Sequence, residues 1–539
     1  MNKISILYTT IILFLFSSCQ KNFLDRQPLD AYSNSSLWTN ANDANAALNG
    51  VYSGWASPWS DNGPGWADGF NVVYFDCASD NAYSQFPWEG FQSYGNGLVT
   101  PTDGNADNLW SYVTIQKCNF FLANIGPTPM DSTLKTQMIA QVRFIRAYEY
   151  FLISQLYGDV PLVTTSLTPA QANVSVRTPK DSVTQFIIHE LAAAAPDLLP
   201  SYVGTPNQGH ITKGAALALK MRVELYEQDY TDCITDAQAV MQLGYSLFPS
   251  YTNLFRIQNE GNSEDIIDAQ YIEGASPYLA NGTLGVMQTS SLGGWSSIDP
   301  LQSLVDSYEM NNGKTIDDPT SGYDPTNPYA NRDPRLTETI LCPGQKYSGI
   351  YYDPLDASSP DYYSGNNNSK TGYEVIKFTS NLSDFDNIWN TGLDMMIIRY
   401  AEVLLSDAEA KIELNQIDAT VYNDINLVRN RAGMPSVDQT VYNNQATLRT
   451  LVRRERRVEF AMEGLRYFDI QRWQIGPAVM NGPVYGARLG TVNTTNGQLT
   501  LTGTNIPVET RQFANKNYLW PVPQAEININ KNLKQNPGF

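Results

Sequence analysis

The chain contains 539 residues, of which 54 are acidic and 35 basic, so its formal net charge at pH 7 is −19. Hydrophobic residues make up 42% and charged residues 17%, which is typical of globular proteins and not of disordered chains. The acidic balance argues against binding to nucleic acid, whose phosphates require Lys and Arg, and against electrostatic docking on anionic lipid. A neutral ligand is compatible with this charge.

The N-terminus carries the first strong signal. An apolar run at residues 4–16 is too short to span a bilayer and is typical of a signal-peptide core. Two serines then precede Cys19, and Phe-Ser-Ser-Cys resembles a bacterial lipobox, although Leu is more usual than Phe16. We predict that residues 1–18 are a lipoprotein signal peptide and that Cys19 carries several acyl chains, which anchor a protein stably. Ordinary secretion with cleavage near Ser18 is the alternative.

Four further cysteines are widely spaced and form no CxxC motif: Cys77, Cys118, Cys233 and Cys342. This spacing does not support a zinc or redox site. Disulfides are compatible with export, but we predict buried free thiols.

Helical periodicity is clearest at Ser132–Tyr157, where apolar residues recur every three or four positions. Asp131 or Ser132 can cap the start of this predicted helix, and Gly158 with Pro161 can end it.

Two more regions show the same periodicity. Residues 213–243 predict two helices with a break near Gln228 and Asp229, and residues 398–463 predict further helices. Small alanines would let paired helices approach closely, as in tetratricopeptide repeats of ~34 residues. We predict a mainly α fold in which about four such pairs stack into a superhelical wall.

Long stretches rich in turn residues separate the helices, and such loops in a compact protein are usually functional. Short alternations at residues 373–378 and 518–522 predict a few short strands. No clean linker is visible, so we predict one domain over residues 19–539. Its helical scaffold would occupy mainly residues 37–50, 110–270 and 395–475, and a loop-rich ligand-binding face mainly residues 51–109 and 273–392.

Motifs for catalysis are missing from the sequence. It has only two histidines and no HExxH, Cys/His cluster, nucleophile elbow, P-loop, Rossmann fingerprint or EF-hand loop. Paired carboxylates for glycoside hydrolysis stay open, because the partners need not be close in sequence. We predict a protein that is not an enzyme and that needs no metal or cofactor.

Aromatic residues supply the positive signal. The loop-rich residues 51–109 hold many Trp, Tyr and Phe side chains among Asp, Asn and Gln, and Trp295 lies in a glycine-rich setting. A sugar has flat C–H faces that an aromatic ring can cover, and a rim of hydroxyls that polar side chains can bind. Packing of the loops onto the scaffold is the competing explanation, because aromatic rings bury large areas.

Several blocks of the sequence carry a recognisable pattern. Residues 143–162 read RFIRAYEYFLISQLYGDVPL, and ERR at residues 455–457 is followed by EGLRYFDIQRW at 463–473. Further blocks are DSYEMNNGK at 306–314, NRDPR at 331–335, RYAEVLL at 399–405, RNRAG at 429–433, YLWPVP at 518–523 and QNPG at 535–538. These blocks, in this order, resemble the SusD/RagB family, the starch-utilisation-type surface lipoproteins of Bacteroidetes, and residues 455–473 are the most specific of them.

The resemblance implies four tetratricopeptide helix pairs, an insertion-rich ligand face and binding without catalysis. It also implies an outer-membrane location facing the cell surface, and a SusC-like TonB-dependent transporter as partner. We expect the protein to capture oligo- or polysaccharide and deliver it to that transporter. The alternatives are a RagB-like protein that binds peptide or another nutrient, a tetratricopeptide interaction scaffold and a surface glycoside hydrolase.

The family's binding aromatics come from variable loops, so the resemblance places them only by position. Residues 76–81 look like the loop before the site, with Trp88 just beyond, and Trp295 precedes the block at 306–314. We therefore predict Trp88 and Trp295 as a stacking pair. The secondary candidates are Trp66, Tyr83, Asn81 and Tyr94.

Three expectations concern charge. A calcium ion occurs in some relatives, but this sequence offers no identifiable ligand set for it. The charged residues inside apolar helices, such as Arg146, Glu455 and Arg466, are predicted to form buried ion pairs. Asp80, beside the predicted site, is a candidate for a structural role.

Overall fold

The computed structural model describes residues 38–55, 69–103, 109–274, 281–379 and 382–539. Cys19 and Trp66 lie outside these residues, so the predictions for them stay predictions. Among the described helices, none combines the length and apolar character that crossing a membrane requires.

Helix α6 (Ser132–Tyr157) begins and ends where the sequence predicts. The side chain of Asp131 caps it by accepting a hydrogen bond from the backbone N–H of Leu134 at 2.9 Å. Gly158 ends it with a φ of 73°, a conformation that residues with a Cβ rarely adopt.

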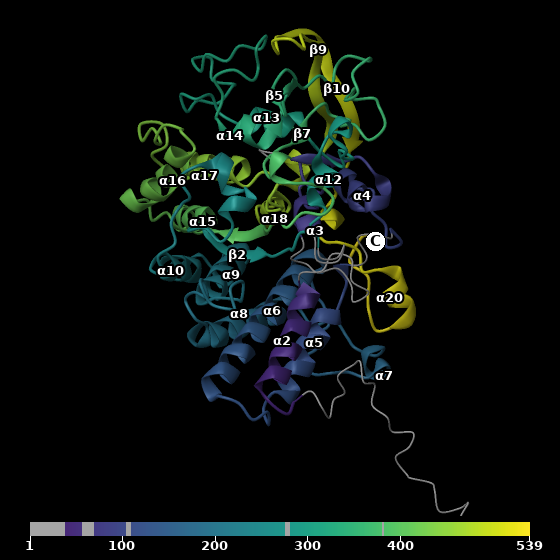
Figure 1. Ribbon diagram of the computed structural model, residues 1–539, viewed down its shortest axis with the longest axis vertical. Coiled ribbons are helices and arrows are strands. Elements are labelled where there is room, and N and C mark those ends of the chain that lie inside the picture. Colours follow the sequence, from purple (N-terminus) through teal and green to yellow (C-terminus); the bar gives the residue numbers. More distant parts are fainter. Residues whose placement is uncertain (1–37, 56–68, 104–108, 275–280, 380–381) are drawn as a thin grey trace, which may run out of the picture.

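The scaffold consists of helices that pack in chain order, each against the next. In Figure 1 they occupy the lower and left parts of the molecule, and the mainly α fold is confirmed. Gln228, with a φ of 64°, lies at the predicted break between two of them. Their bounds are α2 (Ala41–Trp55), α5 (Val113–Asn124), α6, α8 (Lys180–Ala194), α9 (Lys213–Tyr226), α10 (Tyr230–Met241), α15 (Tyr400–Glu413), α16 (Ala419–Arg431) and α17 (Gln445–Glu459).

Short elements between and after these helices form the loop-rich part of the molecule. The helices are α3 (Gly69–Tyr74), α4 (Phe91–Asn96), α7 (Pro169–Ala172), α11 (Tyr251–Leu254), α12 (Thr283–Met287), α13 (Gln302–Ser307), α14 (Arg335–Thr339), α18 (Arg466–Arg472), α19 (Gly476–Val479) and α20 (Gln524–Ile529). The strands are β1 (Ala82–Ser84), β2 (Asp265–Ala269), β3 (Ile298–Pro300), β4 (Ile340–Leu341), β5 (Lys346–Tyr347), β6 (Ile350–Tyr351), β7 (Glu374–Val375), β8 (Met395–Arg399), β9 (Gly482–Val492) and β10 (Leu499–Arg511).

The strands pair antiparallel in two-stranded sheets: β1 with β3, β2 with β8, β4 with β7, β5 with β6 and β9 with β10. The alternation at residues 373–378 yields β7, which is only two residues long. The strand predicted at residues 518–522 is wrong. There the chain docks onto the end of α6, and the backbone N–H of Trp520 donates to the carbonyl of Leu156 at 2.7 Å.

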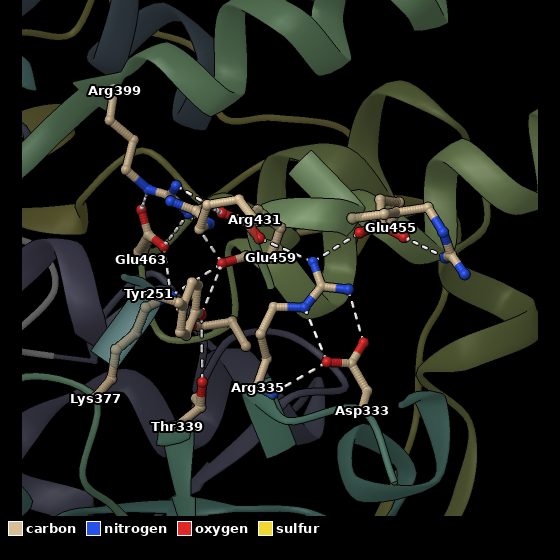
Figure 2. A network of polar contacts seen from close by, with 12 residues as sticks. Tyr251, Asp333, Arg335, Thr339, Lys377, Arg399, Arg431, Glu455, Glu459 and Glu463 are labelled. Atoms are coloured by element: carbon tan, nitrogen blue, oxygen red, sulfur yellow. Dashed lines mark hydrogen bonds and ion pairs between the residues drawn. The ribbon is translucent and has the colours of Figure 1, made fainter. Parts of the chain in front are cut away.

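A network of buried charges joins the scaffold to the loop-rich part (Figure 2). Arg335 of α14 donates to Asp333, to Glu455 at 2.6 Å and to Glu459 at 2.8 Å. Arg399, at the end of β8, contacts Glu459 and Glu463 at 2.7 Å each. The prediction of buried ion pairs is confirmed here and also at Arg146, which pairs with Glu190. Removing one partner from such a pair leaves an uncompensated buried charge.

The four cysteines described by the structure are buried free thiols, as predicted: Cys77, Cys118, Cys233 and Cys342. Burial raises the pKa of the Cys118 and Cys342 thiols well above the usual value for cysteine.

Candidate functional site: an exposed aromatic surface

Four aromatic side chains from three separate loops meet at the surface. The rings of Trp88 and Trp295 lie 5.8 Å apart at an interplanar angle of 82°. Phe86 stacks against Trp88 at 5.3 Å, and Trp389 lies 4.7 Å from Trp295. Trp88 is 55% exposed and Trp295 39%, although both are large apolar groups. We call Phe86, Trp88, Trp295 and Trp389 the aromatic surface.

A short 3-10 helix, Pro87–Glu89, positions Trp88. Pro87 fixes its first turn, and Gly90 ends it with a φ of 90°. Because β1 precedes this helix and pairs with β3, the segment that carries Trp88 lies beside the segment that carries Trp295.

The backbone around Trp295 is held by hydrogen bonds to three other segments. Its N–H donates to the carbonyl of Gly285 at 2.9 Å. The buried amide of Gln85 donates to the carbonyls of Trp295 at 2.9 Å and Ser296 at 2.7 Å. Ser296 has a φ of 47°, and its hydroxyl donates to Glu374 at 2.6 Å. Trp295 is therefore presented by a fixed turn, and Gln85 joins that turn to the segment carrying Phe86 and Trp88.

Trp389 was not among the predicted site residues. Its indole N–H donates to the carbonyl of Gly293 at 3.0 Å, and its ring covers Gly285, where an added Cβ would lie 2.2 Å from the ring. Both glycines are about a hundred residues away in the sequence. The glycine-rich composition around Trp295 is the one signal that could have indicated a ring packed there.

The charged block at residues 455–466 holds the loop that leads into β1. Arg466 donates to Asp80 at 2.7 Å, and Arg457 contacts Asp80 at 3.1 Å. Burial alone would raise the pKa of Asp80, but Arg457 and Arg466 outweigh it and lower that pKa to about 2. Asp80 thus has a structural role, and the most specific sequence block orients the loop before the aromatic surface.

Buried carboxyl groups lie next to the aromatic surface. Burial raises the pKa of Glu89 to about 7, although the hydrogen bond that its carboxyl accepts from Ser84 lowers the pKa. Burial also raises the pKa of Glu374, which receives the Ser296 hydroxyl, well above its usual range. Both side chains are buried, so they support the turns around the rings from inside the protein.

The structure brings Trp88 and Trp295 together, but places the secondary candidates differently. Asn81 is fully buried: its amide donates to Asp76 at 2.7 Å and its oxygen accepts from Arg457 at 2.9 Å. Tyr94 is buried against Trp520, with ring centroids 3.8 Å apart. Tyr83 is half-buried in β1, and its hydroxyl accepts from Gln92.

The arrangement presents partly exposed aromatic rings at fixed angles to one another. Such a surface can cover flat apolar faces of a ligand, with geometry set before the ligand arrives. In the part of the chain that the structure describes, no group of three or more His, Cys, Asp or Glu side chains could hold a metal ion.

Comparison with known families decides the relationship. A sequence model described as the SusD family matches residues 253–539, which is more than half of the chain. The protein belongs to the SusD family. A second model, described as starch-binding associating with outer membrane, matches residues 22–225.

Individual relatives agree with this membership. The structure of a SusD-like carbohydrate-binding protein from Bacteroides fragilis is 31% identical, with a TM-score of 0.80, and the match covers 92% of this chain and 100% of that one. A SusD-like protein from Bacteroides ovatus is 25% identical over 88% of this chain and 82% of its own. The starch-binding protein SusD of Bacteroides thetaiotaomicron is 26% identical over 80% of this chain and 78% of its own.

Proposed function

We propose that this SusD-family protein binds oligo- or polysaccharide at the aromatic surface, without catalysis. It would then deliver the glycan to a SusC-like TonB-dependent transporter of the outer membrane. In this proposal the acyl chains on Cys19 anchor the protein to that membrane, facing outwards.

The observation that carries the proposal is the exposure of Trp88 and Trp295 at fixed angles to Phe86 and Trp389. Large rings left in water are unfavourable unless a ligand covers them, and burying one fully is worth roughly 1.5–3 kcal/mol. The pyranose rings of a glycan present the flat C–H faces that fit such rings. Relatives named as starch-binding and carbohydrate-binding support the same ligand class.

Two further parts of the proposal rest on other observations. The lack of catalytic motifs in the sequence and the binding names of the relatives support a role without turnover. The lipobox-like sequence at Cys19 and the family description that mentions the outer membrane support the anchor. A tethered binding protein beside its transporter works at high effective concentration, so weak glycan affinity is sufficient for delivery.

The test is a titration of the protein without its first 19 residues against plant, host and microbial polysaccharides, by affinity electrophoresis and calorimetry. We expect retarded migration on at least one polysaccharide, with no release of reducing ends. Trp88→Ala and Trp295→Ala should each weaken that binding by more than about tenfold, in line with the area of the removed ring.

Different outcomes separate the competing functions. Binding that survives both substitutions would place the site elsewhere. Release of reducing ends by the purified protein would show a hydrolase. If no polysaccharide binds, a mixture of peptides analysed by the same calorimetry would test the RagB-like alternative.

A further inference from the structure

A cavity away from the aromatic surface is lined in part by the β9–β10 hairpin. The hairpin lies at the top of the molecule in Figure 1. The volume of the cavity is about 440 Å³, within the range of ~300–1,000 Å³ typical of small-ligand sites. The hairpin, helix α13 and the segment at residues 316–329 form its walls. None of these residues belongs to the aromatic surface.

The hairpin is irregular where it borders this cavity. Leu501 pairs with Gly490 and Asn505 pairs with Arg488, so residues 502–504 lie opposite Leu489 alone. Two residues of this bulge, Gly503 and Thr504, line the cavity. Bulges re-aim side chains and are over-represented beside functional sites.

One wall of the cavity carries a chain of hydrogen bonds. The hydroxyls of Tyr329 and Tyr373 lie 3.0 Å apart, and Tyr373 donates to the amide oxygen of Gln302 at 2.7 Å. The amide nitrogen of Gln302 donates to one carboxylate oxygen of Asp306 at 2.8 Å. This chain passes through the fully buried Tyr373 and ends at the exposed carboxylate of Asp306, whose orientation it fixes. The second oxygen of Asp306 has no hydrogen bond within the described residues.

Other lining residues supply a guanidinium donor and an aromatic ring. Arg488 donates to the carbonyls of Gly503 and Pro325 at 3.1 Å each, so it bridges the hairpin and the facing segment. Tyr323 is half-buried and lines the cavity, and the guanidinium of Arg332 lies 5.5 Å from its ring centroid. That cation–π contact holds the ring in place.

We propose that this cavity is a second carbohydrate-binding site, which takes one or two neutral pyranose rings. The lining holds one carboxylate and one guanidinium, so its charges balance and a neutral ligand fits better than an ion. Asp306 would accept from sugar hydroxyls, Arg488 would donate to sugar oxygens, and Tyr323 would cover a C–H face.

This inference rests on the proposed function of the aromatic surface and extends it. Strand β3 connects the two places: Trp295 precedes it and Gln302 follows it, seven residues later. Seven residues span at most roughly 25 Å, so an oligosaccharide of a few units has the reach to contact both places. Engagement at two places would make a polymer bind more tightly than a short fragment.

The test uses methyl pyranosides of glucose, galactose, mannose and xylose. Their binding to the protein without its first 19 residues is observed by saturation-transfer NMR. The background is Trp88→Ala with Trp295→Ala, which disables the aromatic surface. We expect saturation transfer to at least one of these sugars, and its loss when Tyr323→Ala is added. Tyr485→Ala is the matched control, because Tyr485 is an exposed tyrosine of the β9–β10 hairpin and does not line the cavity. It should leave the signal unchanged.

The outcomes separate the two proposals. Retarded polymer migration that depends on Trp88 and Trp295, with no pyranoside signal in the double variant, would overturn the second site and leave the first. A signal that persists in Tyr323→Ala would also overturn it. Methyl glucuronide and glucosamine serve as charged probes. Stronger saturation of either than of every neutral sugar would contradict the neutral ligand class.

Discussion

At the scale of single residues, the aromatic surface depends on glycines as much as on its rings. Gly285 lies under the ring of Trp389, and a Cβ there would come within 2.2 Å of the ring. A Cβ added at Gly282, three residues earlier, would lie 3.5 Å from its nearest neighbour, the carbonyl oxygen of Trp389. The two glycines therefore form a matched pair, because only one of them excludes an added methyl group.

We expect Gly285→Ala to displace Trp389 and to weaken polysaccharide binding by about fivefold or more, equivalent to roughly 1 kcal/mol. Gly282→Ala should bind as the parent does, since its methyl group meets only ordinary van der Waals contact. Calorimetry with the bound polysaccharide measures the difference, and tryptophan fluorescence reports the ring's displacement. Equal affinities for the two variants would remove Trp389 from the site.

Gln85 gives a second test at this scale. Its amide donates to two carbonyls of the Trp295 turn, so Gln85→Leu keeps the volume and loses both hydrogen bonds. Each is worth about 1 kcal/mol, and the turn should loosen. We expect a polysaccharide affinity reduced by about tenfold, with the thermal midpoint lowered by only a few degrees. An unchanged affinity would show that the turn keeps its shape without Gln85.

At the scale of elements, helices α17 and α18 orient the loop before β1 through Asp80. We expect Asp80→Asn to destabilise the protein by about 3 kcal/mol, because Arg457 and Arg466 would lose their buried partner. Glu227→Gln is the control: its partner Lys180 is half-exposed, so it should cost less than about 1 kcal/mol. Urea unfolding at neutral pH compares the two. Equal losses would show that the Asp80 pairs contribute no more than surface pairs.

The depressed pKa of Asp80 predicts how the stability of the protein changes in acid. The carboxylate's folded pKa of about 2 lies below the unfolded value of about 3.9. It therefore contributes stability above pH ~4 that is lost as the pH falls toward 2. The unfolding free energy of the parent should fall more steeply between pH 4 and pH 2 than that of Asp80→Asn. Parallel curves would contradict the depressed pKa.

Elements with local signals could be predicted from the sequence, and those fixed by distant contacts could not. The bounds of α6 follow from its apolar periodicity, the cap at Asp131 and the stop at Gly158. The β9–β10 hairpin was missed, because its bulges interrupt the alternation that marks a strand. At the site, Trp88 and Trp295 were predicted from composition and from family resemblance. The burial of Asn81 and Tyr94 depends on Arg457 and Trp520, several hundred residues later in the chain.

At the scale of the whole molecule, acidic charge is distributed unevenly. Most buried carboxylates of the scaffold helices pair with arginine or lysine. In contrast, one pocket beside β2 is lined by four carboxylates that have no Lys or Arg partner within the described residues: Glu260, Asp265, Asp268 and Asp394. Burial, with the neighbouring Asp268 and Glu260, raises the pKa of Asp394 to about 9, and burial raises that of Glu260 to about 7.

These raised pKa values predict lower stability in alkali. The folded protein holds protons that the unfolded chain releases near pH 4, so stability is lost as the pH rises from about 4 through 7 to 9. Asp394→Asn should flatten this decline between pH 6 and pH 9, measured by urea unfolding at several pH values. Asp232→Asn, on the exposed first turn of α10, should leave the slope unchanged. A decline equally steep in Asp394→Asn would contradict the assignment.

The buried thiols turn the protein into its own probe of local opening. Cys118 and Cys233 lie in scaffold helices α5 and α10, Cys77 follows α3 near the loop that leads into β1, and Cys342 follows β4. A thiol reagent can reach each one only when its surroundings open. Pulsed alkylation followed by peptide mass analysis would therefore measure the rate of local opening in the scaffold and in the loop-rich part separately. It needs no change to the parent sequence.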